Sequence, residues 1–102
     1  MDDKAKMVLA ELGEEEILCQ LAEECDELGK AALKLRRVLS GKNPTPVTEA
    51  EARANLIEEI ADVDLCLDVL GLNTYMNGVN ISIISDKKLT RWVKRLEGDM
   101  SW

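Results

Sequence analysis

A break that contains two prolines limits the fold of this chain more than any other feature, because it separates two long helical segments. Residues 14–40 and the segment from 49 to roughly 70–76 both repeat apolar side chains with the period of an α-helix. Between them lies the sequence GKNPTPV, and Pro44 and Pro46 are incompatible with a continuous helix. Gly41 stands where a helix would end. We therefore expect the chain to reverse direction here and form an antiparallel helical hairpin.

Two shorter helices are expected to complete an all-α fold. One covers about residues 2–12 and ends near Gly13. The other covers about residues 80–97 and follows a break at Asn77-Gly78. The last five residues, GDMSW, are expected to be loose. The hairpin plus these terminal helices is predicted to complete a four-helix bundle on oligomerisation.

The length of 102 residues predicts one domain, residues 1–102, with no internal repeat. A chain this short buries only a modest core, so we expect a partner subunit to complete the fold. Thr48 and Glu51 form a capping-box pattern, which places the start of the second long helix at about residue 49. Leu65 and Val69 lie opposite its main apolar stripe, as a helix that contacts a partner would require. That stripe is predicted to contain Leu56, Ile60, Val63, Leu67 and Leu70.

Two acidic couplets are the strongest sign of chemistry. Glu24 and Glu27 lie one turn apart on the first long helix, and Glu59 and Asp62 do so on the second. The first couplet precedes the centre of the turn by about 18 residues and the second follows it by about 16, so both lie at similar heights in a hairpin. Carboxylates are the ligands that Mg²⁺ prefers, and we predict that these four bind it.

The surroundings of the couplets strengthen this prediction. Glu24 falls within an apolar stripe made by Ile17, Leu21, Leu28, Ala31 and Leu35, and Glu59 lies on the flank of the second stripe. A carboxylate at a core-facing position must be paired, protonated or bound to a metal. The alternative is that both couplets are ordinary solvated acids, which are common on helix surfaces.

Basic residues gather in the last helix, where Lys88, Arg91 and Arg95 share one stripe. Lys34 belongs to a second basic line on the first long helix. Beside a metal site, these side chains would suit a polyphosphate ligand. Alternatively, they compensate helix dipoles or form surface ion pairs.

Composition excludes several other functions. The net charge of −7 argues against nucleic-acid binding. The chain has no histidine and no CxxC motif, so it offers neither a nucleophilic triad nor a zinc site. Its three cysteines are expected to be small apolar residues in a reducing compartment. No signal peptide or membrane-spanning segment is recognisable, and we expect a cytoplasmic protein that does not bind a membrane.

At these residues the chain resembles the MazG-like, all-α nucleoside triphosphate pyrophosphohydrolases. EECDEL at 23–28 and EEIADV at 58–63 match the two acidic motifs of that family in content and order. The likeness extends from about Leu21 to Leu96 and includes the connection GKNPTPVTEAEA and the basic final helix KKLTRWVKRL. Asp26 stands where the family commonly has a small residue, and the connection is somewhat long.

The resemblance implies an enzyme that converts a nucleoside triphosphate to the monophosphate and pyrophosphate with Mg²⁺, as in cleansing of the nucleotide pool. It implies that Glu24, Glu27, Glu59 and Asp62 hold the metal ion. It also implies a homodimer or homotetramer with the active site near the subunit interface. Our candidates for contacts with the triphosphate are Lys34, Lys88, Arg91 and Arg95.

Two other functions fit the same residues. A non-catalytic helical dimerisation or interaction module would carry the acids only as solvated side chains. A phosphoribosyl-nucleotide pyrophosphohydrolase would share the metal chemistry and differ in substrate alone.

Overall fold

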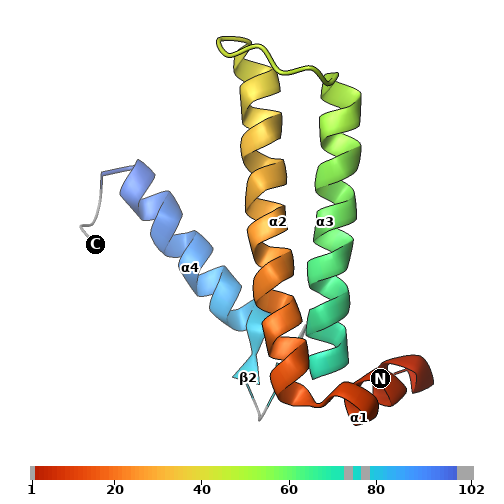
Figure 1. The fold of residues 1–102 in the computed structure, drawn as a ribbon. Helices are drawn as coiled ribbons and strands as arrows, with labels where there is room; N and C mark the ends of the chain where they lie inside the picture. Colours follow the sequence, from red (N-terminus) through yellow and green to blue (C-terminus); the bar gives the residue numbers. More distant parts are fainter. Residues whose placement is uncertain (1, 73–74, 77–78, 99–102) are drawn as a thin grey trace. The chain divides into compact units, whose positions relative to one another are not determined.

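The computed structural model describes residues 2–72, 75–76 and 79–98. Its elements, in chain order, are α1 (Asp3–Leu12), α2 (Glu14–Ser40), α3 (Glu49–Leu70), β1 (Tyr75–Met76), β2 (Val79–Asn80) and α4 (Ile81–Leu96) (Figure 1). The prediction of an all-α architecture is confirmed, and α3 ends at the lower limit of its predicted range. The strands are two residues each, too short to show an alternating sequence pattern. The predicted break at 77–78 and the end of the chain at 99–102 lie outside the described residues.

The chain divides into two compact units, Met1–Leu70 and Gly71–Trp102. The first contains α1, α2 and α3. The second contains α4 and the antiparallel pair of β1 and β2, in which Tyr75 is opposite Asn80. The Asn80 side chain accepts a hydrogen bond from the backbone N–H of Ser82 and so caps the start of α4.

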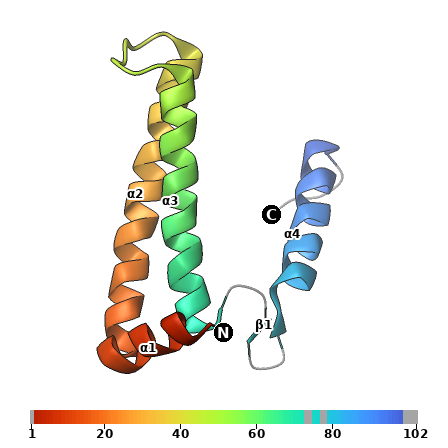
Figure 2. The ribbon, with the colours of Figure 1, turned by 90° about the vertical axis from the view of Figure 1, so that its right-hand side faces the viewer.

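The predicted hairpin is formed by α2 and α3, which run side by side in opposite directions (Figures 1 and 2). Gly41 ends α2 in the left-handed conformation, with φ of 66°, and donates its N–H to the Arg37 carbonyl at 3.0 Å. The capping box is also confirmed. The Glu51 N–H donates to Thr48 Oγ1 at 3.1 Å, and the Thr48 N–H donates to Glu51 Oε1 at 3.3 Å. Both ends of the turn are therefore fixed by local bonds.

Small side chains bring the two long helices close together. Ala31 of α2 and Ala52 of α3 are each only 1% exposed, the lowest values among the buried residues. Glu24 lies seven residues from Ala31, and Glu59 lies seven residues from Ala52, both towards the open end of the hairpin. Seven residues are almost two full turns, so each glutamate lies nearly in line with an alanine of its own helix. The row of side chains between α2 and α3 thus passes from apolar residues to carboxylates.

This packing corrects the predicted face of α3. The buried line of α3 contains Ala52 and Cys66, and Glu59 lies on that line instead of on the flank of the stripe. Ile60, which was predicted within the stripe, is 49% exposed. The other predicted members of the stripe, Leu56, Val63, Leu67 and Leu70, are half-buried, so the buried face of α3 extends from them to Ala52 and Cys66, whose small side chains allow a close approach to α2.

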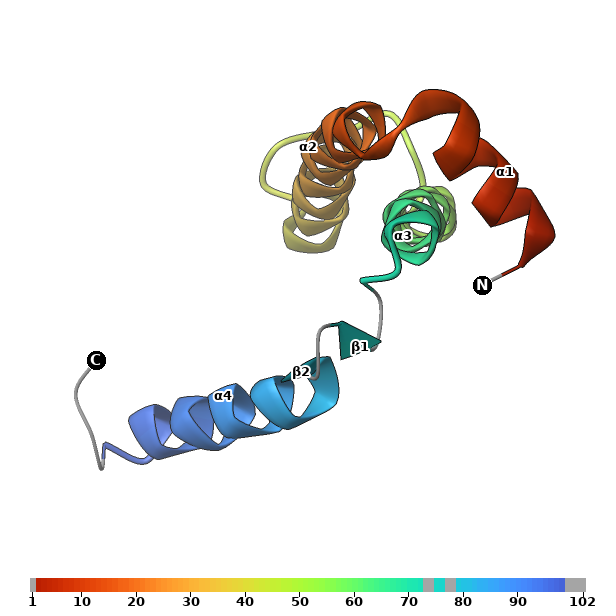
Figure 3. The same cartoon turned by 90° about the horizontal axis from the view of Figure 1, so that it is seen from below.

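A small core closes the open end of the hairpin, where α1 passes beside α3 (Figure 3). Ala5, Ile17 and Val69 form this core, and Leu9 and Leu70 pack against it. Val69 was predicted to face a partner subunit, but it is 5% exposed and packs against its own chain. A helical-wheel projection of α3 alone could not show that Val69 is buried within its own chain, because α1 supplies the covering surface.

The second unit differs from the first in burial. Every residue of α4 is exposed except Arg95, which is half-buried. The exposed apolar side chains of α4 include Ile84 at 43% and Trp92 at 59%. Within the described residues, no helix is long and apolar enough to cross a membrane.

Candidate metal centre

Three of the four predicted metal ligands come together between α2 and α3. Carboxylate oxygens of Glu24, Glu59 and Asp62 all lie within 4.8 Å of one another. Glu24 comes from α2, and the other two come from successive turns of α3. Glu24 and Glu59 are half-buried, whereas Asp62 is exposed. The group therefore has one open side, at Asp62, through which a ligand could reach it.

The donor set fits a hard divalent cation. Oxygens bound to one Mg²⁺ lie about 2.9 to 4.2 Å apart in an octahedron, so small side-chain rotations would bring these carboxylates to that geometry. Three carboxylates cannot fill six positions without water or another ligand. Such a centre would leave room for phosphate oxygens, as Mg²⁺ sites that act on nucleotides commonly do.

Repulsion among the acids is visible at Glu59. Partial burial raises the pKa of its carboxyl above the ordinary value of 4.5, and the negative charges of Asp62, Glu24, Glu27 and Glu58 raise it further. The ion pairs formed among the described residues join Lys30 with Glu27 and Arg53 with Glu49. They give the three clustered carboxylates no basic partner. A bound cation would remove this repulsion.

Glu27, the fourth predicted ligand, lies outside the three-carboxylate group. Its side chain is 53% exposed, and Lys30 Nζ lies 3.3 Å from its Oε1. It is still close enough to raise the pKa of Glu59. The structure therefore places Glu27 at the edge of the group, as an acid that would have to leave Lys30 to bind the same ion.

Two neighbours of the group were missed by sequence reasoning. Gln20 Nε2 donates a hydrogen bond of 2.8 Å to Glu24 Oε1 and so orients that carboxylate. The spacing of four residues on a helix could have indicated this contact. Cys66 is buried one turn after Asp62, and burial raises the pKa of its thiol, with Glu24 and Asp62 adding to the shift. The thiol is therefore protonated at neutral pH and unsuited to act as a nucleophile.

The other two cysteines do not have the predicted environment. Cys19 and Cys25 are exposed on α2, and only Cys66 is buried as a small apolar residue would be. All three are free thiols. At 100° per residue, Cys25 lies about 80° from the centre of the buried stripe of α2 and Cys19 about 160° from it, so both positions fall outside the stripe.

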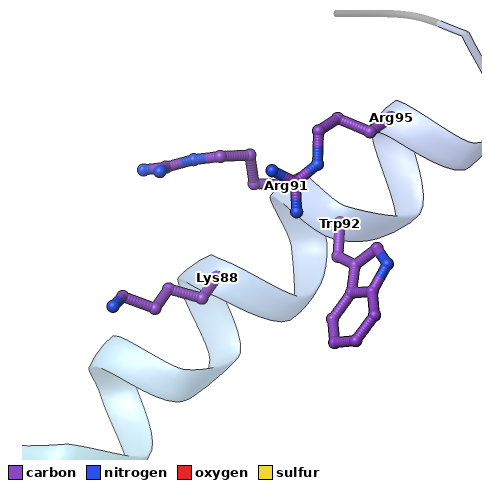
Figure 4. Close-up of a pocket in the computed structure, with 4 residues that line it drawn as sticks. All are labelled: Lys88, Arg91, Trp92 and Arg95. Carbon is purple, nitrogen blue, oxygen red and sulfur yellow. The ribbon is translucent and has the colours of Figure 1, made fainter. Parts of the chain in front are cut away.

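The predicted phosphate ligands fall into two groups. Lys34 is half-buried on α2, seven residues beyond Glu27 and about 10 Å from it along the helix axis. It therefore belongs to the same unit as the carboxylates. Lys88, Arg91 and Arg95 belong to α4, where they line one hollow together with Trp92 (Figure 4). The structure thus confirms that these three cations share a face.

Comparison with known proteins adds no assignment. The chain matches no protein-family model, and no curated protein or solved structure is significantly similar to it. The candidate site is therefore interpreted from its own geometry and chemistry.

Proposed function

We propose that this protein is a Mg²⁺-dependent nucleoside triphosphate pyrophosphohydrolase, which gives a nucleoside monophosphate and pyrophosphate and serves to cleanse the nucleotide pool. The observation that carries this proposal is the convergence of Glu24, Glu59 and Asp62 from two helices, with Glu24 and Glu59 half-buried. Repulsion between carboxylates at a helix interface lowers the stability of the folded protein. A metal-dependent activity would explain why the carboxylates are there.

The residues around the metal site have separate proposed roles. Glu24, Glu59 and Asp62 would hold Mg²⁺, with Gln20 keeping the Glu24 carboxylate in place and Glu27 available as a further ligand. When bound, Mg²⁺ polarises phosphate oxygens and lowers the pKa of coordinated water. Water is added across the anhydride bond between the α and β phosphates, and pyrophosphate leaves.

The cations supply the complementary charge for the substrate. Lys34, Lys88, Arg91 and Arg95 are proposed to neutralise phosphate oxygens of the nucleotide. The guanidinium groups can form paired hydrogen bonds with phosphate, whereas the lysines act as point charges. Developing negative charge on the leaving pyrophosphate would be stabilised by the same groups.

A homodimer or homotetramer is part of this proposal, with helices of two subunits forming a four-helix bundle. Large apolar side chains on the hairpin support it, because Ile57 is 66% exposed and Leu65 is 60% exposed on α3. Exposed apolar residues that cluster on one element commonly mark a protein interface. The same observation favours the second candidate function, a non-catalytic interaction module.

Turnover assays distinguish the two functions. We would incubate the protein with Mg²⁺ and each of the common ribo- and deoxyribonucleoside triphosphates, and measure pyrophosphate release. A phosphoribosyl nucleotide with a diphosphate or triphosphate group would be included, because the metal chemistry is the same. We expect release from at least one nucleotide, and Glu59→Gln should lower kcat/KM by at least about 100-fold.

The matched control is Glu58→Gln, which removes an exposed acid from the neighbouring position and should leave turnover largely unchanged. If no nucleotide releases pyrophosphate, and Mg²⁺ does not raise the melting temperature of the unmodified protein, the interaction module is the correct function.

A further inference from the structure

The hollow on α4 combines charged and aromatic side chains in a way that the metal centre does not require. It is lined by Lys88, Arg91, Trp92 and Arg95, and it encloses about 340 Å³. That volume is at the lower end of the range typical of small-molecule sites. Its four residues occupy two successive turns of one helix, since positions 88, 91, 92 and 95 follow the spacing of a single face.

Figure 4 shows how these side chains differ in direction. Lys88 and Arg91 extend to the same side of α4, and the Trp92 indole leaves the helix on another side. The Arg95 side chain folds back along the helix towards the preceding turn. Trp92 is 59% exposed, so a large part of its ring is open to a ligand. The face therefore offers cations for an anionic group and, beside them, an aromatic surface for a flat one.

We propose that Trp92 is a nucleobase-binding residue, whose indole stacks on the base of a nucleotide while Lys88 and Arg91 contact its phosphates. The choice of a nucleoside triphosphate as the ligand rests on the proposed function. Stacking on an aromatic ring tolerates different bases, because every base has a flat π-face. Trp92 would thus contribute affinity for the nucleoside part, which neither Mg²⁺ nor the cations recognise.

A free nucleotide suits this face better than a nucleic-acid strand. The net charge of the chain is −7, which disfavours binding of a long polyanion. The hollow also spans only two helical turns, which is enough for one nucleotide. An extended strand would need a longer basic groove with several aromatic side chains.

The test uses the full chain in EDTA, so that binding does not depend on the metal centre. The chain has two tryptophans, and Trp102→Phe leaves Trp92 as the sole indole fluorophore. ATP, GTP and inorganic tripolyphosphate are titrated into this variant, with affinities measured by calorimetry. We expect ATP and GTP to quench Trp92 fluorescence and to bind more tightly than tripolyphosphate, which should bind without comparable quenching.

Substitutions then distinguish the contribution of the base to binding from that of the phosphates. Trp92→Ala should weaken ATP binding by about 5- to 150-fold and leave tripolyphosphate binding nearly unchanged, and Trp92→Phe should restore most of the loss. Lys88→Ala should weaken the binding of both ATP and tripolyphosphate. Val93→Ala is the matched control, since Val93 is 46% exposed on the same helix and does not line the hollow.

The inference would be overturned by failure of ATP and GTP to bind, by equal losses for ATP and tripolyphosphate in Trp92→Ala, or by tighter binding of an oligo(dT) strand than of ATP. Circular dichroism of Trp92→Ala checks that the helices are retained. Binding of ATP with no pyrophosphate release from any nucleotide would refute the proposed hydrolysis alone. Turnover that is unaffected by Trp92→Ala, in KM as well as kcat, would refute only the role of Trp92.

Discussion

The α2–α3 hairpin and α4 expose their charged side chains in different ways. In the hairpin, Glu24 and Glu59 are half-buried in the row of residues that joins two helices, and Glu59 is repelled by its neighbours. In α4, every cation except the half-buried Arg95 is exposed, together with the apolar residues. The hairpin therefore loses stability by keeping its acids, whereas α4 holds its cations in water, where they cost little. Ligand binding should stabilise the hairpin most.

The largest expected contrast concerns apolar burial. Ile17→Ala, at a residue 4% exposed in the core beside α1, should lower the free energy of unfolding by about 2–4 kcal/mol. Ile84→Ala removes the same atoms from a side chain of α4 that is 43% exposed and should cost about 0.5 kcal/mol or less. Urea denaturation of both variants measures the difference. If Ile84→Ala lowers the free energy of unfolding as much as Ile17→Ala does, and this loss grows with protein concentration, a partner subunit covers α4.

A second contrast separates substrate binding from metal binding. Arg91→Ala should raise KM for the nucleotide by about tenfold, the loss expected for one phosphate contact, and leave Mg²⁺ affinity without nucleotide unchanged. Lys87→Ala is its control, because this exposed lysine of α4 does not line the hollow. Steady-state kinetics and calorimetry provide the two measurements. If Arg91→Ala also weakens Mg²⁺ binding, the assignment of the two roles is wrong.

A third comparison ranks the acids within the hairpin. Glu24→Gln should weaken Mg²⁺ binding by about tenfold or more, because Glu24 is a member of the three-carboxylate group. Glu27→Gln should weaken it by only about threefold, because Glu27 lies at the edge and pairs with Lys30. Calorimetric titration with Mg²⁺ gives both values. Equal losses would indicate that Glu27 leaves Lys30 and becomes a full ligand.

The smallest effect concerns pH. Because the pKa of Glu59 is raised in the folded protein, protonation of Glu59 favours the folded state. This contribution is fully present below the ordinary value of 4.5 and is lost as pH rises through the folded pKa. Without metal, the melting temperature of the unmodified protein relative to Glu59→Gln should therefore increase as pH falls through that interval. Melting curves of both proteins in EDTA test this, and a parallel pH dependence would contradict it.

Much of the hairpin could be predicted from its sequence, because local signals determine it. Glycine and two prolines fix the turn, the capping box fixes the start of α3, and helical spacing brings acids to neighbouring turns. The burial of Ala52, Cys66 and Val69 on α3 could not be predicted in this way. It depends on how closely Ala52 and Cys66 allow α2 to approach and on the surface that α1 supplies to Val69.

The site shows the same division. Three carboxylates were predicted correctly as a group because two helices repeat the same short spacing. The separate position of Glu27 depends on a competing ion pair with Lys30, which spacing alone cannot rank against metal binding. The hollow beside Trp92 depends on side-chain directions on α4, which helical spacing alone does not give.

The change from alanines to glutamates along the interface between α2 and α3 has a consequence for local opening. Ala31 and Ala52 are closely packed between the helices, whereas at Glu24 and Glu59 the carboxylates of the two helices repel each other. Amide hydrogens near the glutamates should therefore exchange with solvent faster than those near the alanines. Millimolar Mg²⁺ should slow hydrogen exchange only at the amides near the glutamates. The rate of local opening of the hairpin would then depend on the concentration of free Mg²⁺.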